Sequence, residues 1–248
     1  MIPKVVAGFH IRDDDWVLPI KLRALSQFCE KIVVMLDRSG PGTLEICRQY
    51  PQVEVYAHQN TRGLADEGPD GPICEEGIMR QEVWDILARD NPEWIVLGDA
   101  DEIPTPDIIP FLENAPKEGV DLYYLHWVQL YKTADQHISG TKCVWSYQYP
   151  QSAKKGAIVR FDPIRHAKGG YKYRQDMYRH TRLEPSPISQ VKHSLTPRQV
   201  LVDYPRLIHW KWVNWPKWDG SFQANLPKYQ KFFDGMELAT TPKDWLWL

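Results

Sequence analysis

A short apolar run that ends in acidic residues constrains this chain more than any other feature. Trp94–Leu97 are four apolar residues in succession, which is typical of a strand buried on both faces, and Gly-Asp-Ala-Asp-Glu follows at once as residues 98–102. Because side chains two residues apart in an extended chain point the same way, we expect Asp99 and Asp101 to converge on one cation past the small Ala100. Mg²⁺ or Mn²⁺ suits such carboxylates. The alternative is an ordinary acidic loop after a buried strand.

Strands and helices alternate through the first 105 residues. Strands are expected at 4–9, 31–36, 53–57 and 94–97, and helices at 17–28, 43–49 and 75–89. This order predicts βαβ units, a mostly parallel sheet, and a ligand at the carboxyl ends of its strands. We expect Asp15 to cap the first helix, with Pro19 tolerated in its first turn. Residues 60–77 are rich in Gly, Pro and acids and are interpreted as a loop that orders over the ligand.

The remaining residues predict a mixed second half within a single domain of residues 1–248. Strands are expected at 120–130, 141–149 and 156–161, another within 201–212, and a closing helix at 223–233. The predicted division is 1–105 and 106–248.

The composition narrows the class of protein. With 43% hydrophobic and 25% charged residues, it is that of a globular chain. The four cysteines form no C-x-x-C pair, which favours reduced thiols over a disulfide framework or a zinc site. No apolar run approaches the ~20 residues that span a membrane, and the N-terminus runs directly into a predicted strand. We therefore expect a cytoplasmic protein.

Positive charge is concentrated in one part of the chain. Residues 154–182 hold nine Lys or Arg and two Asp, a balance of +7, against −9 for the rest of the chain. Aromatic residues are interleaved with these charges, as in nucleic-acid surfaces. The asymmetry indicates an anionic ligand, and a solvated basic face is the alternative.

Residues 1–105 resemble the glycosyltransferases of the GT-A fold, and most closely family 2. The resemblance rests on "IVVMLDRSGPGTLEI", on a following helix that carries Arg80, and on "WIVLGDADEI". It implies an α/β GT-A fold: a Rossmann-like, mostly parallel sheet with helices on both faces, followed by a mixed acceptor half. It also implies a metal-dependent enzyme that moves a hexosyl or pentosyl group from a nucleoside diphosphate sugar, expected to be a UDP-sugar, to a hydroxyl group.

The resemblance assigns the donor site residue by residue. Asp37 would contact the base or ribose, although it could instead only form a turn. Arg80 would meet the donor or help to place the first Asp of the motif, unless it is a surface arginine paired with a neighbouring glutamate. Asp99, Ala100 and Asp101 would line the nucleotide-sugar site. Asp101 would be the firmer metal ligand, and Glu102 would support it.

Such enzymes often add a late histidine to the metal site. His209 ends an apolar strand-like run and is the predicted third ligand, beside Asp99 and Asp101. His126 has a similar setting and is the second choice. A core histidine bonded to a backbone carbonyl is the alternative for His209.

An inverting enzyme also needs a carboxylate that accepts the proton of the acceptor hydroxyl. Asp176 is the nearest match to the family pattern and is our predicted catalytic base. It departs from that pattern because Gln175 replaces the preceding acid. Asp162 and Asp135 follow as candidates, and Asp176 could instead only pair with a neighbouring arginine.

The acceptor and two other classes of function stay open. A saccharide is the default acceptor, and a modified base in DNA is the second. A nucleotidyltransferase of related fold would want a Gly-rich, basic loop after the first strand, which residues 10–14 do not provide. A non-catalytic carbohydrate- or DNA-binding module would not need Asp99 and Asp101.

The DNA acceptor predicts a salt-dependent affinity. Binding to duplex DNA should weaken steeply, by about tenfold or more, between 50 and 200 mM salt, because bound phosphates release counterions. The double change Lys154→Glu and Lys155→Glu should weaken binding and flatten the salt slope, whereas Lys228→Glu with Lys231→Glu, outside the run, should change neither as strongly. Fluorescence anisotropy measures both. Absence of binding at low salt would remove DNA as an acceptor.

Overall fold

The structure, a computed structural model, describes most of the chain. The described residues are 4–12, 14–37, 39–57, 71–115, 119–138, 154–167, 172–175, 181–184, 199–210, 213 and 238–247. The strand expected at 141–149, the closing helix expected at 223–233 and the predicted base Asp176 lie outside them.

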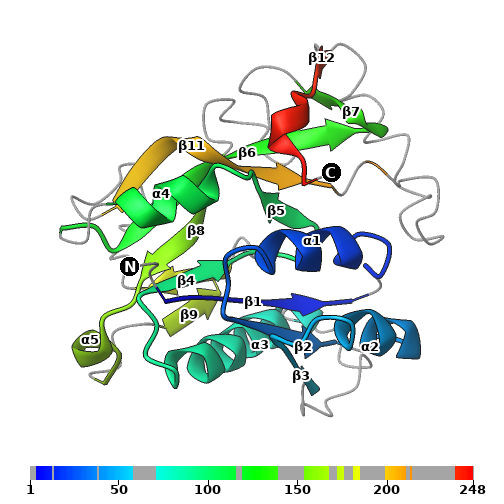
Figure 1. The fold of residues 1–248 in the computed structure, drawn as a ribbon. Helices are drawn as coiled ribbons and strands as arrows, with labels where there is room; N and C mark the ends of the chain where they lie inside the picture. Colours follow the sequence, from blue (N-terminus) through cyan, green and yellow to red (C-terminus); the bar gives the residue numbers. More distant parts are fainter. Residues whose placement is uncertain are drawn as a thin grey trace.

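Four parallel strands form one half of the sheet. They are β1 (Val5–Ile11), β2 (Lys31–Leu36), β3 (Val53–Ala57) and β4 (Trp94–Leu97), in the spatial order β4-β1-β2-β3. All four coincide with strands expected from the sequence. Their carboxyl ends lie at one edge of the sheet, as expected for consecutive βαβ units (Figure 1).

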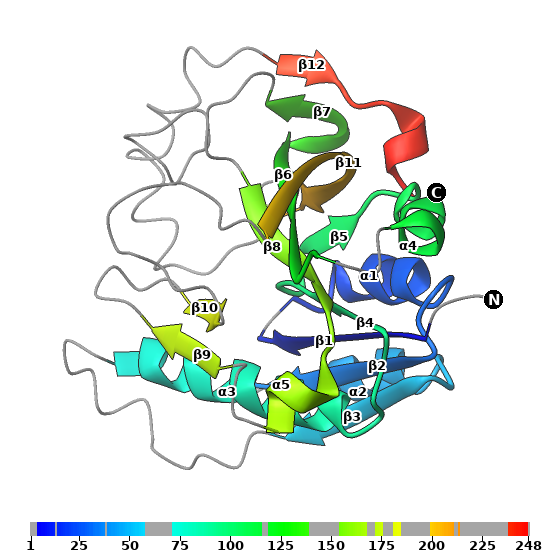
Figure 2. The ribbon, with the colours of Figure 1, turned by 90° about the vertical axis from the view of Figure 1, so that its left-hand side faces the viewer.

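Mixed pairing extends this sheet to ten strands within the described residues. β8 (Lys154–Arg160) is antiparallel to both β4 and β6 (Leu122–Tyr131). β11 (Gln199–His209) runs parallel to β6 and antiparallel to the short β5 (Glu102–Pro104). β7 (Thr133–Ile138) and β12 (Leu238–Thr240) follow β6 at the other edge. A separate hairpin, β9 (Lys172–Gln175) and β10 (Thr181–Glu184), lies beside helix α3 (Figure 2).

Helices cover both faces of the parallel half. α1 (Leu18–Leu25), α2 (Pro41–Cys47) and α4 (Ile108–Asn114) contribute to the core on one face, and α3 (Gly71–Ala88) packs on the other. The short α5 (Pro163–Ala167) and a 3₁₀ turn, η2 (Lys243–Trp245), complete the helical elements among the described residues. The expected α/β class, a mostly parallel sheet with helices on both faces and a mixed second half, is confirmed.

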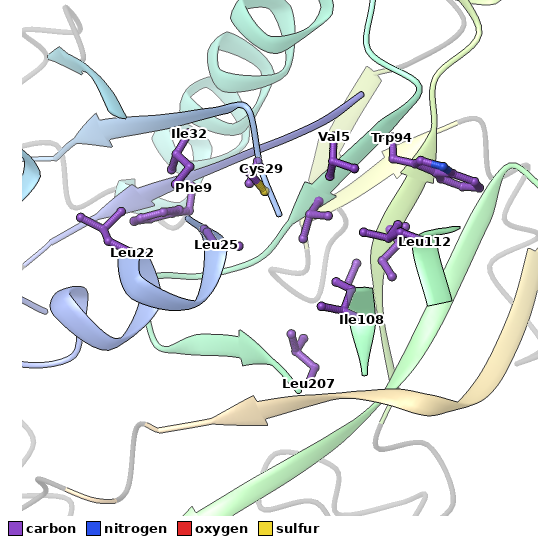
Figure 3. Close-up of a cluster of buried hydrophobic side chains, with 14 of the residues drawn as sticks. Val5, Phe9, Leu22, Leu25, Cys29, Ile32, Trp94, Ile108, Leu112 and Leu207 are labelled. Atoms are coloured by element: carbon purple, nitrogen blue, oxygen red, sulfur yellow. The ribbon is translucent and has the colours of Figure 1, made fainter. Parts of the chain in front are cut away.

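The two core layers follow from the alternation of side chains along β1. Val5 and Phe9 point toward α1 and pack with Leu22 and Leu25 (Figure 3). The intervening Val6 points to the opposite face, where it joins the side chains of α3. A strand that is apolar on both faces can thus hold two helix layers together.

Two local expectations are wrong. α1 begins with Val17 as its N-cap and has no side-chain cap, because Asp15 instead accepts a hydrogen bond from the hydroxyl of Thr43 in α2. α3 begins at Gly71, so residues 71–77 of the expected loop are helical. Pro72 is compatible with this start, since a helix makes no use of the N–H groups in its first turn. Residues 60–70 of that loop lie outside the described part.

Two of the four cysteines can be placed with their side chains. Cys29 and Cys47 are buried free thiols. Burial raises the pKa of Cys29 well above its ordinary value, and burial together with Asp15 raises the pKa of Cys47 to about 11. Both thiols are therefore protonated at neutral pH and poorly reactive.

None of the described helices is both long enough and apolar enough to cross a lipid bilayer.

Gly8 in β1 is a point of close approach between α3 and the sheet. A Cβ added there would lie 2.4 Å from Val83 Cγ1 and 2.8 Å from Leu87 Cδ1. We expect Gly8→Ala to push α3 outward and lower the free energy of unfolding by about 1–3 kcal/mol, as overpacking does. Urea denaturation measures this loss. Gly40→Ala, with nothing within 4 Å of the added carbon, should lose less than about 1 kcal/mol; an equal loss in both variants would contradict the packing argument.

Candidate functional site

The carboxyl ends of β1 and β2 bring together an arginine and an aspartate. The Asp37 amide donates to the Ile11 carbonyl at 2.9 Å, which continues the pairing of the two strands. The Asp37 carboxylate is 7% exposed and accepts a hydrogen bond from Arg12 Nε at 2.6 Å. Asp37 is thus a fixed, paired acid at the expected edge of the sheet, and its contact with a nucleoside stays a prediction.

The residues after β4 form a turn, which we call the acid turn (98–102). The Glu102 amide donates to the Asp99 carbonyl at 3.1 Å, and this bond closes the turn. The expectation of an extended chain, with Asp99 and Asp101 side by side, is therefore wrong. The two carboxylates leave the turn toward different elements.

Asp99 meets helix α3. The Arg80 guanidinium donates to the Asp99 carboxylate, and these side chains are 12% and 35% exposed respectively. The close packing of α3 on Gly8 sets this reach, because Val83 and Arg80 lie one turn apart on the helix. A small pocket with room for about one water lies beside Arg80 and is lined by Gly8, Phe9, His10, Arg80, Val83, Leu97 and Gly98.

Asp101 meets strand β11. The Asp101 carbonyl accepts the Trp210 amide at 2.8 Å, and β5 pairs with the end of β11 just beyond it. This pairing brings His209 Nε2 to 3.2 Å from Asp101 Oδ2, with side chains 4% and 11% exposed. The Trp127 ring lies 4.4 Å from the His209 ring, centroid to centroid. His209 Nδ1 and Trp127 Nε1 are buried atoms without a hydrogen-bond partner.

The predicted three-ligand metal site does not assemble in this arrangement. Within the described part of the chain, no three His, Cys, Asp or Glu side chains lie close enough together to share a metal ion, because Asp99 turns to α3 and Asp101 turns to β11. The spacing of Asp101 and His209 is that of an ion pair and is also compatible with two ligands of one cation. Two neighbouring ligands at ~2.1 Å from an octahedral ion would be about 3.0 Å apart, close to the observed 3.2 Å. Both donor atoms are ones that Mn²⁺ accepts.

The second-choice histidine lies elsewhere. His126 in β6 pairs in register with Arg206, and its Nε2 is 3.5 Å from Asp203 Oδ1 on an exposed surface. The acid turn lies beside His209, further along β11 than Arg206.

Two buried charged residues hold the acid turn through hydrogen bonds to its main chain, to a greater extent than the sequence indicated. Glu102 is fully buried, and its carboxylate accepts the Asp99 amide at 2.7 Å. Lys21 in α1 is 3% exposed, and its ammonium donates to the Asp99 carbonyl at 2.8 Å. The burial of Lys21 could have been inferred from its position, because it lies on the apolar face of α1 among leucines at helical spacing.

The described residues of the basic run 154–182 do not form one continuous surface. Arg160 pairs in register with Trp94, at the amino end of β4, whereas the backbone of Lys154 lies toward the carboxyl end. Arg165 forms an ion pair with Asp121 at 2.6 Å. The run is therefore divided between opposite ends of the sheet.

The alternative bases have other positions. Asp162 accepts the amide hydrogens of Ile164 and Arg165 at 2.9 and 3.2 Å and so begins α5. Asp135 lies in β7, near β12. Neither belongs to the group of residues at the acid turn.

Comparison with known proteins gave likenesses of fold alone. No family model and no curated protein matches the sequence, so the resemblance to family 2 gains no support from them. A solved structure of 4-diphosphocytidyl-2C-methyl-D-erythritol synthase is similar at 13% identity and a TM-score of 0.40, over 64% of this chain and 76% of its own. The corresponding synthase of Anaerococcus prevotii DSM 20548 is similar at 12% identity and a TM-score of 0.32, over 64% and 70%.

The role of Glu102 can be tested by its removal. Glu102→Ala leaves the Asp99 amide without its charged acceptor and opens a buried space, so the free energy of unfolding should fall by about 2–4 kcal/mol. Urea denaturation measures the loss. Glu45→Ala, an exposed site on α2, is the matched control and should change it by less than about 0.5 kcal/mol. If the two variants are equally stable, Glu102 does not hold the turn.

Proposed function

We propose that this chain is a transferase whose nucleotide-activated substrate binds where β1, β2 and β4 end. The observation that carries the proposal is the Asp101–His209 pair beside two acid–arginine pairs, Asp37 with Arg12 and Asp99 with Arg80. Cationic side chains at this edge suit a phosphate chain, and carboxylates suit ribose hydroxyls or a metal.

Mn²⁺ or Mg²⁺ would be held by Asp101 and His209. When bound, the ion would neutralise the negative charge that develops on the phosphate leaving group. The protein's own contribution is to orient the substrate. Arg80 is held by the Asp99 carboxylate, and the Trp127 ring beside His209 excludes water from one side of the pair.

Sugar transfer is the first candidate reaction. A nucleoside diphosphate sugar, with a UDP-sugar first in order, would lose its nucleoside diphosphate as an acceptor hydroxyl attacks the sugar carbon. A saccharide is the default acceptor. The hydroxyl proton would pass to a carboxylate, for which Asp176, outside the described residues, stays the candidate. Residues 12–17, between β1 and α1, contain no glycine, which favours this reaction over one that needs a Gly-rich phosphate cradle.

Nucleotidyl transfer, on a related fold, is the second candidate. It would use a nucleoside triphosphate, join the nucleoside monophosphate to a phosphate-bearing acceptor, and release pyrophosphate. Two guanidinium groups at one edge, Arg12 and Arg80, suit a triphosphate as well as a diphosphate. The two reactions therefore share a site and differ in the leaving group.

A ligand panel decides between these readings. Thermal shift with UDP, CDP, GDP, CTP and UDP-sugars, each with and without Mn²⁺, should show stabilisation that requires the metal. For each ligand that binds, ³¹P NMR then identifies the product with a panel of saccharide and sugar-phosphate acceptors. A released nucleoside diphosphate supports sugar transfer, and pyrophosphate supports nucleotidyl transfer. No stabilisation by any nucleotide would overturn the proposal.

Asp101→Asn tests the metal pair directly. The amide keeps the size of the side chain but loses the charge, so Mn²⁺-dependent turnover should fall about 100-fold or more while the melting temperature stays close to wild type. Asp85→Asn, on the exposed face of α3, is the matched control. Full turnover of Asp101→Asn in Mn²⁺ would show that the assignment of Asp101 is wrong.

A further inference from the structure

Lys21 is a buried cation that donates hydrogen bonds to the main chain of the acid turn. It is 3% exposed, and its ammonium donates to the carbonyl oxygens of Asp99 and Glu102, at 2.8 and 2.5 Å. The ring of Phe9 in β1 lies 4.8 Å from the same nitrogen. Two main-chain carbonyls of the turn, one of which closes it by accepting the Glu102 amide, are thus held by one side chain of α1.

The cost of this arrangement indicates that it has a purpose beyond packing. A buried ammonium loses its hydration, and the leucines at neighbouring positions of α1 fill the core without that cost. Leu22 and Leu25, on the same face of the helix, are buried in the hydrophobic core. The distinctive property of Lys21 is its donors, which reach main-chain oxygens that no leucine can satisfy.

The turn is held from both faces of the sheet. Lys21 holds its carbonyls from the side of α1, and Arg80 holds the Asp99 carboxylate from the side of α3. At Gly98 the space is close to its limit: an added Cβ would lie 3.2 Å from Glu102 Oε2 and 3.5 Å from Lys21 Nζ. With both ends fixed, Asp101 has its carboxylate directed to His209.

We infer that Lys21 is a positioning residue for the metal pair: its ammonium fixes the acid turn in the shape that presents the Asp101 carboxylate to His209. The inference rests on the proposed role of Asp101 and His209 as ligands of a divalent cation. Lys21 itself touches neither the ion nor the substrate. Without its ammonium, the Asp99 carbonyl keeps the Glu102 amide as a donor, but both carbonyls lose their link to α1. The turn then relaxes, and the separation of the two ligands is no longer fixed.

The test compares Mn²⁺ affinity between matched lysine variants. Lys21→Met keeps the length of the side chain and removes the ammonium, so the dissociation constant of Mn²⁺, measured by EPR on the full chain, should rise about tenfold or more. Lys31→Met is the control, because Lys31 pairs with Glu54 and Asp90 at the start of β2. Melting temperatures are measured for both. An unchanged Mn²⁺ affinity in folded Lys21→Met would overturn the inference.

A milder variant tests the inference if Lys21→Met does not fold, and a metal-free measurement tests it if wild type binds no Mn²⁺. If Lys21→Met does not fold, Lys21→Gln retains one amide donor and should still weaken Mn²⁺ binding, by about threefold or more; affinity equal to wild type would count against Lys21. Amide hydrogen exchange without metal should be faster at Asp99 and Trp210 in the Lys21 variants than in Lys31→Met, and equal rates would overturn the inference. If wild type binds no Mn²⁺ but exchange is faster in the Lys21 variants, the metal proposal fails, and Lys21 is shown only to hold the shape of the acid turn.

Discussion

The candidate site depends on the hydrogen bonds that two buried charged residues make to one turn. Glu102 accepts the Asp99 amide, and Lys21 donates to the Asp99 and Glu102 carbonyls. Buried charges are costly unless they are paired or hydrogen-bonded, and here the main chain of the turn supplies such bonds. The consequence is a loop with little freedom at a place where loops are usually mobile. A rigid turn can direct two neighbouring acids to different partners, Arg80 and His209.

The sheet places those partners by two different kinds of contact. On one face, the missing Cβ of Gly8 lets α3 approach β1, and this brings Arg80 to the acid turn. At the edge, the antiparallel pairing of β5 with β11 brings His209 to Asp101 from late in the chain. The parallel half therefore supplies the acids and arginines, and the mixed half supplies the histidine. A site of this composition suits a phosphate-bearing ligand and a divalent cation, which both proposed transfer reactions would use.

Much of the fold could be predicted because local sequence patterns determine it. The apolar stretches of β1 to β4 and the leucine spacing of α1 are visible in short windows of sequence, and these elements are where they were expected. The acidic residues were also correctly expected at a strand end. The shape of the acid turn was not, because its hydrogen-bond partners lie in α1 and β11. The cap of α1 was misplaced for a similar reason: Asp15 has a partner, Thr43, in the next helix.

The sequence by itself determined the class of fold, the edge at which Asp37, Asp99 and Asp101 gather, and the strand that ends in His209. It did so because side-chain periodicity and strand direction are local properties of a chain. Only the tertiary structure decided that Asp101 turns to His209 and away from Asp99, and that Lys21 is buried beneath the turn. These are outcomes of packing between segments far apart in sequence, where the cost of burying a charge is offset only by partners that no local window contains.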